Sequence, residues 1–468
     1  MSEPHVVILG GGPAGCGAAF ELRRRQRGKV TLIEQQDVVG GNAGSFEVSG
    51  IRVDYGSHRL HATCDPAILA DIKTMLGPDL ADRERHGRIL LRGNYVRFPL
   101  NAKDLLLRLD KPFAFGAARD MAVRTLLGKR VEGDTFASVL MANLGGTICE
   151  HFYFPYARKI WGRPPQELSG IQARKRVTAS SFAKLMRRLA TPPGKGRFFY
   201  PRRGYGQISE AYAETGKKLG AELMLGWKVT RVEQTAGARQ RWRIEVSRQG
   251  DVREIRADHV WSTLPVSLLA RLITPAPPPP VLAAANEIDY RAMILVYLEL
   301  DWDQFTTTDA HYFPEERIRA TRISEPKNYF GLPTPAGRTI LCAELPCAPT
   351  DPLWSMTDAE LGQVVVDDLR RAELPLIRPP VNVCVKRLRQ AYPIYALGYE
   401  KPLRRLQDWV EGLPDLLSYG RQGLFAHDNT HHALFMAYRA VECLEDGIFD
   451  RARWAEHRKI FATHVVED

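Results

Sequence analysis

The sequence predicts an α/β fold in which a parallel sheet carries a dinucleotide-binding turn, because a short apolar strand runs directly into a glycine-rich turn and a helix. Residues 6–9, Val-Val-Ile-Leu, are typical of a buried strand, and Gly10, Gly12 and Gly15 follow in G-x-G-x-x-G spacing. A second apolar strand, residues 30–33, ends at Glu34. An acid about 20 residues after such a turn accepts hydrogen bonds from a nucleotide ribose.

Each glycine of this turn has a separate physical role. Gly10 makes the tight turn, Gly12 lets a pyrophosphate approach the main chain, and Gly15 lets the helix pack on the strand. The helix that begins at Pro13 and Ala14 offers unpaired N–H groups and the positive end of its dipole. The predicted cofactor-binding residues of this region are Gly10, Gly12, Pro13, Ala14, Gly15 and Glu34. The alternative, a glycine-rich turn of another α/β protein, leaves Glu34 unexplained.

The composition is that of an ordinary globular protein large enough for two or three domains: 468 residues, 44% hydrophobic and 25% charged. The formal net charge is +11, which fits an anionic substrate, a peripheral contact with a membrane surface, or only a solvated basic surface. No aromatic-plus-basic module indicates nucleic acid. No apolar run reaches the roughly 18 residues of a membrane span, and we expect no signal peptide. Seven scattered cysteines without a C-x-x-C favour reduced thiols, a cytoplasmic location and no metal site.

Further along the chain, the pattern predicts a small hairpin over residues 44–55, mostly helix over 65–190, and strands between 221 and 264. The proline-rich residues 274–280 predict a loop or linker. Strands of a second sheet are expected at Met293–Leu300 and Thr339–Leu345, and a helix at Ala433–Leu444.

Four patches give the chain a family resemblance. They are the dinucleotide turn, a second glycine turn at Gly40-Gly41-Asn42, the segment YARKIWGRPPQEL at 156–168, and the stretch from Gly420-Arg421 to Asn429. Together they resemble the FAD-dependent superfamily of amine oxidases and protoporphyrinogen oxidase, with motifs similar to UDP-galactopyranose mutase.

The resemblance implies a discontinuous Rossmann-like FAD-binding domain formed by residues 1–65, 196–268 and 413–468. A helical substrate or lid subdomain, 66–195, and a mixed-sheet substrate domain, 269–412, would build the substrate cavity. The further FAD-binding residues that it implies are Gly40, Gly41, Asn42, Gly56, Ser57, His58, Val229, Arg421 and Asn429.

Residues 56–63, Gly-Ser-His-Arg-Leu-His-Ala-Thr, are similar to the G-x-H-x-F-H-T of the mutase family. The similarity places His58 beside the flavin ring, whereas His61 is a weaker candidate; both could instead be structural histidines. For a sugar diphosphate we favour Arg176 over Arg174, because a guanidinium binds phosphate oxygens in pairs, although both arginines could lie on a solvated helix face. We name His58, Arg176 and Tyr205 as catalytic candidates, with Lys159 and Arg203 as further substrate contacts.

The chain also departs from these families. Phe425 and His427 occupy the positions of two substrate-binding tyrosines of the mutases. Residues 289–293 lack the lysine that amine oxidases place near the flavin, and the motif for covalent flavin attachment is absent, so we expect Cys443 to be a buried apolar residue. Ala437 replaces the usual glycine near the flavin.

Three functions remain open from the sequence. The first is an FAD-dependent oxidoreductase that takes a hydride from a substrate C–H in a cavity between the domains; a single dinucleotide motif argues against a built-in NAD(P)H domain. The second is a non-redox sugar-nucleotide mutase that uses reduced flavin. The third is a flavin-bearing binding protein without turnover. In each case the expected ligand is a small molecule, anionic or a sugar nucleotide, and the oligomeric state stays open.

Overall fold

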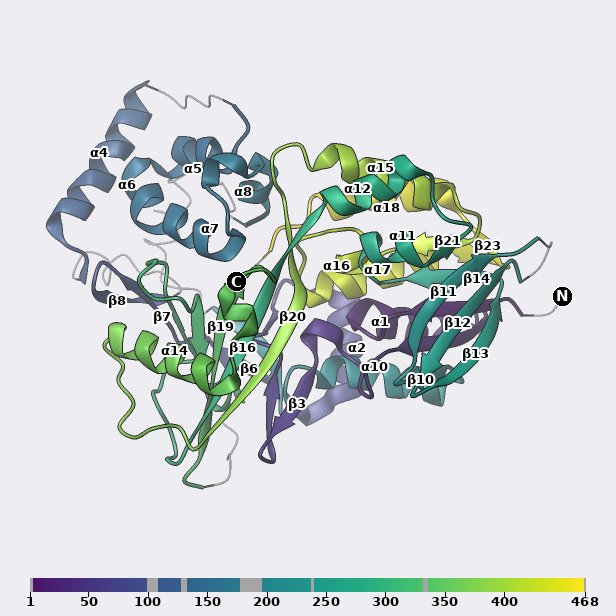
Figure 1. Cartoon of the computed structure of the whole chain (residues 1–468), viewed down its shortest axis with the longest axis horizontal. Coiled ribbons are helices and arrows are strands. Elements are labelled where there is room, and N and C mark those ends of the chain that lie inside the picture. Colours follow the sequence, from purple (N-terminus) through teal and green to yellow (C-terminus); the bar gives the residue numbers. More distant parts are fainter. Residues whose placement is uncertain are drawn as a thin grey trace.

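The computed structural model describes residues 3–98, 108–127, 133–176, 196–236, 240–330 and 336–466. Two large sheets organise these residues (Figure 1). A five-stranded parallel sheet lies in the half of the molecule that contains the N-terminus, and a seven-stranded sheet lies in the other half, beneath a group of helices. The predicted α/β fold is confirmed.

The parallel sheet draws its strands from distant parts of the chain. Its order is β10 (Glu222–Leu225), β2 (Lys29–Glu34), β1 (His5–Leu9), β14 (His259–Ser262) and β21 (Leu416–Ser418). Val6 and Ile8 pack on the face covered by helices, whereas Val7 and Leu9 pack against the opposite face. Because both faces are covered, the strand reads as a continuous apolar run rather than an alternating one.

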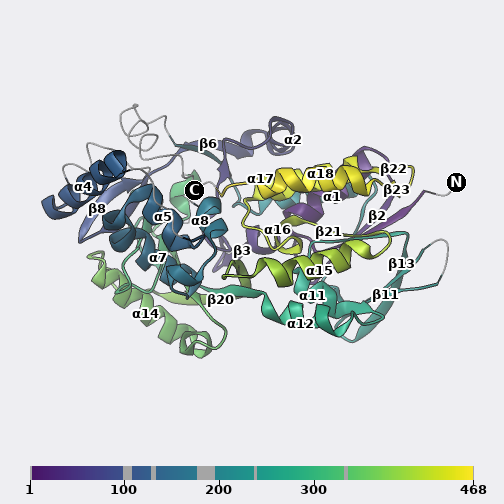
Figure 2. The same cartoon turned by 90° about the horizontal axis from the view of Figure 1, so that it is seen from above.

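Helices and a small sheet cover these two faces. On one side lie α1 (Pro13–Arg24), α10 (Gln207–Lys218) and α17 (Thr430–Glu442). On the other side is a sheet of order β13 (Asp251–Ala257), β12 (Trp242–Arg248), β11 (Lys228–Gln234) and β15 (Ile273–Thr274), next to α11 (Val266–Leu272), α12 (Pro279–Glu287) and α15 (Glu400–Gly412). Figure 2 shows α17 and α18 (Arg451–Ala462) above the sheet and α11, α12 and α15 on its other side.

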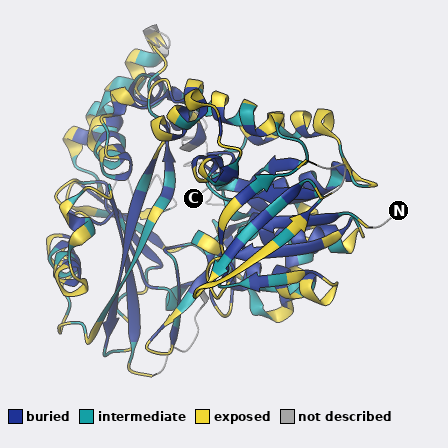
Figure 3. Ribbon diagram, turned by 45° about the vertical axis from the view of Figure 1, so that its right-hand side comes forward, coloured by how far each residue is buried: buried dark blue, intermediate teal, exposed yellow. Residues whose placement is uncertain are grey.

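The seven-stranded sheet forms the second core. Its order is β20 (Asn382–Ile394), β16 (Asp289–Leu300), β19 (Thr339–Cys347), β18 (Arg322–Ser324), β17 (Ala310–Tyr312), β7 (Gly87–Leu91) and β8 (Asn94–Phe98). Its neighbours pair antiparallel except β17 and β7, which are parallel. The α14 helix (Asp358–Arg371) packs on it. Figure 3 shows that the central strands of the two large sheets are mostly buried, whereas exposed residues lie on the outer helices and on outer strands such as β13.

Short elements complete the described chain. The predicted hairpin is confirmed as β3 (Ser45–Val48) and β4 (Ile51–Asp54). A three-stranded sheet has the order β5 (Leu60–His61), β9 (Arg197–Pro201) and β6 (Leu80–Glu84), and β22 (Leu444–Glu445) pairs with β23 (Ile448–Phe449). The remaining helices are α2 (Pro66–Leu76), α4 (Lys111–Leu127), α5 (Phe136–Leu144), α6 (Gly146–Ile148), α7 (Phe154–Trp161), α8 (Gly170–Arg176), α13 (Lys327–Phe330) and α16 (Gly420–Gly423).

The expectation of mostly helix over residues 65–190 is wrong for residues 80–98, which form β6, β7 and β8. The β7–β8 turn contains Arg92 and Gly93, both with positive φ (52° and 76°). Such a pair forms a tight hairpin turn, which forces the apolar run 89–91 into a strand. Residues 177–190 lie outside the described part of the chain. Across the described ranges we find no helix with the length and apolar character that a bilayer crossing requires.

Candidate functional site

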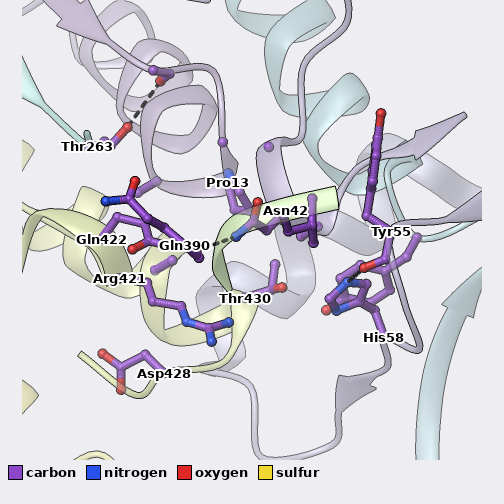
Figure 4. A pocket seen from close by; sticks show the side chains of 18 of the residues that line it. Pro13, Asn42, Tyr55, His58, Thr263, Gln390, Arg421, Gln422, Asp428 and Thr430 are labelled. Carbon is purple, nitrogen blue, oxygen red and sulfur yellow. Dashed lines mark hydrogen bonds between the residues drawn. The ribbon is translucent and has the colours of Figure 1, made fainter. Parts of the chain in front are cut away.

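A cavity of about 740 Å³ opens where β1 meets α1, between the two large sheets. Segments far apart in the sequence line it, among them the dinucleotide turn, the second glycine turn, residues 55–59, the β20 strand and the segment from Arg421 to Thr430 (Figure 4). The predicted site residues that line it are Gly10, Gly12, Pro13, Ala14, Glu34, Gly41, Asn42, Ser57, His58, Tyr205, Arg421 and Asn429.

The turn after β1 requires its glycines for two different reasons. Gly10 has φ +103°, a conformation that other residues rarely adopt. A Cβ added to Gly15 would lie 2.0 Å from the carbonyl oxygen of Gly10, so only a glycine lets α1 approach the turn this closely. A Cβ added to Gly12 would meet nothing within 4 Å. Gly12 therefore borders open cavity at the N-terminus of α1, an arrangement that can accept a pyrophosphate.

Glu34 closes the same end of the cavity. One carboxylate oxygen accepts the N–H of Gly11 at 2.7 Å, and the other accepts the N–H of Gln36 at 2.9 Å. Burial raises the pKa of Glu34, and these hydrogen bonds oppose that rise. The carboxylate is thus fixed in place at the C-terminal end of β2, where an acid can meet a ribose.

His58 and Tyr205 stack at the other end, with ring centroids 5.3 Å apart. His58 Nε2 lies 2.9 Å from the carbonyl oxygen of Tyr55. A carbonyl only accepts, so Nε2 carries the proton and Nδ1 remains an acceptor. Burial lowers the pKa of His58, which favours the neutral ring.

A buried hydrogen-bond network fixes this end of the cavity. Asp54 accepts from the Ser45 hydroxyl at 2.6 Å, the Tyr200 hydroxyl at 2.6 Å and the N–H of Tyr205 at 2.8 Å. Because these partners sit on different elements, the carboxylate holds the hairpin, β9 and the Tyr205 loop together.

Side chains from two distant segments meet above the turn. Asn42 Nδ2 donates to the carbonyl of Gln390 at 3.1 Å, and Gln422 Nε2 donates to the same carbonyl at 2.8 Å. Arg421 donates to the carbonyl of Ala391 at 2.9 Å and lies over the ring of Tyr392. The β20 strand therefore anchors both the second glycine turn and the C-terminal segment on the cavity.

Six of the seven basic residues that line the cavity were not predicted as site residues, and two of them, Arg59 and Arg322, are held by contacts with neighbouring side chains. Arg322 on β18 binds Glu344 through Nε and Nη2 at 2.7–3.0 Å, and no described residue accepts a hydrogen bond from its Nη1. Arg59 lies between the rings of Phe198 and Tyr329 and donates through Nη1 to the Tyr312 hydroxyl at 3.2 Å.

No sequence signal marked Arg322, because its strand lies far along the chain from the dinucleotide turn. For Arg59 the signal was present, since it directly follows His58. Altogether the cavity is lined by Arg59, Arg85, Arg322, Lys386, Arg387, Arg389 and Arg421, against the acids Glu34 and Asp428.

Other predicted residues lie away from the cavity wall. Gly15, Gly40, Gly56 and Val229 do not line it; Gly15 packs under the turn, and Val229 belongs to the core beside the parallel sheet. Gly40 still supports the turn, since its N–H donates to the carbonyl of Gly11 at 2.8 Å. Arg176 ends α8, and its side chain lies outside the described part of the chain.

The other candidate substrate contacts bind neighbouring parts of the protein or lie exposed at the surface. Lys159 Nζ donates to the carbonyls of Phe313, Glu315 and Ala320, and burial lowers its pKa to about 7. Arg174 pairs with Asp134 at the surface, and Arg203 is exposed.

The residues near the C-terminus at which the chain departs from the families lie partly in the cavity wall and partly in the core. His427 lines the cavity, whereas Phe425 is buried in the core. Ala437 packs against Gly17 of α1, and Cys443 is a buried free thiol.

A family model described as flavin containing amine oxidoreductase matches residues 13–439. Phytoene dehydrogenase of Streptomyces griseus is 40% identical over 126 residues, which are 27% of this chain and 23% of that protein. Polyamine oxidase 5 of Oryza sativa subsp. japonica is 32% identical over 103 residues, 22% of this chain and 21% of that protein. The chain thus matches only about a fifth of the length of these curated relatives.

Solved structures show the same fold over the whole chain. Reduced UDP-galactopyranose mutase superposes with a TM-score of 0.82 at 21% identity, covering 100% of this chain and 99% of that one. Putrescine oxidase bound to putrescine gives 0.65 at 17% identity, covering 94% and 98%. These likenesses establish the fold, and the family match confirms the predicted resemblance. The chain belongs to the flavin-containing amine oxidoreductase family.

Proposed function

We propose that the chain binds FAD in this cavity and oxidises a small anionic substrate by removing a hydride from a C–H bond. One observation carries the proposal: the dinucleotide turn and a wall of arginines open into the same cavity. When bound, FAD supplies a two-electron acceptor, which molecular oxygen or another acceptor would then reoxidise.

The residues present fit FAD. Glu34 would hold the adenosine ribose, and the main chain at Gly12 with the first turn of α1 would hold the pyrophosphate. Asn42, Arg421 and Asn429 line the continuing cavity toward His58 and would contact the flavin half. We further propose the domain division 1–65, 196–268 and 413–468 for FAD and 66–195 with 269–412 for substrate. The parallel sheet supports it, because β1, β10 and β21 come from the three FAD segments.

The charge of the cavity supports an anionic substrate. Seven basic residues line it against two acids, and the pyrophosphate of FAD would neutralise only part of this excess. Nε and Nη2 of Arg322 donate to Glu344, so Nη1 remains for a ligand. Arg322 also lies over the ring of Tyr312, and Arg59 donates to the hydroxyl of that tyrosine. A carboxylate or phosphate of the substrate would bind Arg322 through that open edge.

His58 is proposed as the proton acceptor. Its Nδ1 keeps a lone pair, because Nε2–H donates to the carbonyl of Tyr55, and the residue lines the cavity. As the hydride leaves a carbon that bears a hydroxyl or amine, Nδ1 would take the O–H or N–H proton, so that the product is a carbonyl or imine. Tyr205 would keep the imidazole in place by stacking.

The test is anaerobic mixing of the flavin-loaded protein with pairs of compounds that differ only in charge, such as 2-hydroxy and 2-amino acids and their amides. We expect the anionic member of one pair to bleach the flavin absorbance and its amide to be at least about 10-fold slower. If no compound reduces the flavin, the oxidoreductase proposal fails.

A mutase is the second candidate, since the open edge of Arg322 also suits the diphosphate of a sugar nucleotide. In that case protein reduced with dithionite should interconvert ring isomers of a UDP- or TDP-hexose without net flavin oxidation. Absence of any isomer product across these nucleotides would exclude the mutase.

A further inference from the structure

A compact cluster of Asp428, His432 and His464 lies where the C-terminal segment returns to the start of α17. Asp428 Oδ1 is 3.5 Å from His432 Nδ1 and 3.4 Å from His464 Nδ1. One ligand atom from each residue lies within 4.8 Å of the others. Asp428 precedes α17, His432 is in its first turn, and His464 follows α18. Figure 4 shows Asp428 below Arg421, on the side away from Asn42.

The Asp428 carboxylate lies within ion-pair distance of two imidazoles but makes no hydrogen bond with the described residues. Its side chain has no solvent-exposed surface, and neither oxygen accepts a hydrogen bond from the described residues. Burial of a charged carboxylate without hydrogen bonds is strongly unfavourable unless a cation compensates for it. The Lys175 ammonium is close enough for its charge to interact with Asp428. Its hydrogen bond goes to the carbonyl of Phe461 at 3.4 Å and not to the carboxylate.

His432 cannot supply the missing proton from Nδ1. The N–H of Asn429 donates to that atom at 3.2 Å, so Nδ1 presents a lone pair. Two acceptor atoms, Oδ1 of Asp428 and Nδ1 of His432, therefore lie 3.5 Å apart with no hydrogen bond between them. A cation bound to both would remove this repulsion, and His432 would release the N–H of Asn429 to bind it, because a ring nitrogen has a single lone pair.

The spacing suits a tetrahedral metal ion. Metal–ligand bonds of about 2.0–2.1 Å in a tetrahedron place neighbouring ligand atoms about 3.4 Å apart. The two separations from Asp428 Oδ1 match that edge. The imidazole rings of His432 and His464 stack at 4.2 Å and 14°, so one ring would turn about its Cβ–Cγ bond to aim its lone pair at the ion.

We propose that Asp428, His432 and His464 bind one divalent transition-metal ion of the zinc class. Two imidazoles and one carboxylate are a ligand set that Zn²⁺ accepts, and a water molecule would take the fourth position. The ion would tie residues 464–466, which follow α18, to the start of α17. Val466, two residues beyond His464, lines the same cavity and donates its N–H to the carbonyl of Lys175 at 2.9 Å. The site would thus hold residues 464–466 against the cofactor cavity.

The test uses untagged, full-length, flavin-loaded protein that has been treated with a chelator and then titrated with Zn²⁺ in a calorimeter. We expect one Zn²⁺ per chain, and one Co²⁺ per chain with the visible absorption of a tetrahedral ion. His464→Ala should lower the affinity by at least about 10-fold and abolish that absorption. Asp428→Asn should do the same, and His464→Ala remains informative if Asp428→Asn does not fold.

The matched control is His457→Ala. This histidine lies on α18, close in sequence to His464, and contacts Glu442 rather than Asp428. It should bind Zn²⁺ as the unchanged protein does. Absence of stoichiometric binding, or equal binding by the His464→Ala variant, would overturn the proposal and leave Asp428 and His464 as a carboxylate–imidazolium pair. Because flavin is bound throughout, this outcome is independent of whether the substrate proposal holds.

Discussion

Two glycines of one turn, exchanged separately for alanine, should affect different properties: Gly12→Ala mainly FAD affinity, and Gly15→Ala the stability of the fold. Gly12→Ala adds a methyl group where a Cβ meets nothing within 4 Å, at φ −73° and ψ −179°, which alanine adopts freely. Gly15→Ala places a Cβ 2.0 Å from a main-chain oxygen that cannot rotate away. The first change leaves the fold intact and narrows the cavity, whereas the second forces α1 away from the turn.

The magnitudes follow from these contacts. For the flavin-free protein, Gly12→Ala should lower the free energy of unfolding by at most about 1 kcal/mol, the difference between glycine and alanine at a helix N-cap. It should weaken FAD binding by about 1–3 kcal/mol, about 5- to 150-fold, because the methyl group occupies the space of the pyrophosphate. Gly15→Ala should lower the free energy of unfolding by about 1–3 kcal/mol even without FAD.

The assay combines urea unfolding of flavin-free protein with fluorescence titration of FAD. The reasoning is refuted if Gly12→Ala folds normally and binds FAD as tightly as the unchanged chain. It is equally refuted if Gly15→Ala leaves the stability of the flavin-free protein unchanged.

Three further predictions concern named contacts. Glu34→Gln keeps the size of the side chain but removes its charge, so the free energy of FAD binding should weaken by about 1–3 kcal/mol in the same titration. An unchanged affinity would show that Glu34 does not contact the nucleotide. Arg322→Met leaves Glu344 buried without its cation and should lower the free energy of unfolding, measured in urea, by about 3–5 kcal/mol. The double variant with Glu344→Gln should recover most of that stability, and a double variant as unstable as Arg322→Met would contradict the pairing. Lys159 has its pKa lowered to about 7 in the folded protein from 10.5, so above pH 7 the unfolded chain holds a proton that the folded chain has released. Stability should therefore rise between about pH 7 and pH 10 more steeply than in Lys159→Met, and parallel pH profiles would disprove this.

The parts of the fold predicted from sequence were those that local patterns determine. The apolar run at β1, the glycine spacing and Glu34 all lie within one crossover, and the structure forms that crossover, with Glu34 accepting the N–H of Gly11. The hairpin at 45–54 was recognisable from the spacing of its apolar residues, Phe46, Val48, Ile51 and Val53. In the structure Ser49 and Gly50, both with positive φ, form its turn. By contrast, β7 and β8 were missed because an apolar run such as 89–91 suits a helix and a strand equally.

The cavity wall could be predicted only in part, for reasons of topology. Arg322 reaches the cavity because β18 pairs with β19, far along the chain from the dinucleotide turn. Asn42 and Gln422 meet at the carbonyl of Gln390, a contact that depends on the course of β20. Such contacts follow from the three-dimensional pairing of distant strands, and no local sequence pattern encodes them. Lys159, a basic residue in a family-like motif, binds main-chain carbonyls in the structure, and its sequence neighbourhood gave no sign of these contacts.

The most direct test of the account is the identity and amount of flavin released when purified protein is denatured. We predict one FAD per chain, released without covalent attachment, and no FMN. Protein that carries no flavin, and takes up none when incubated with FAD, would contradict the proposed cofactor site and the chemistry inferred from it.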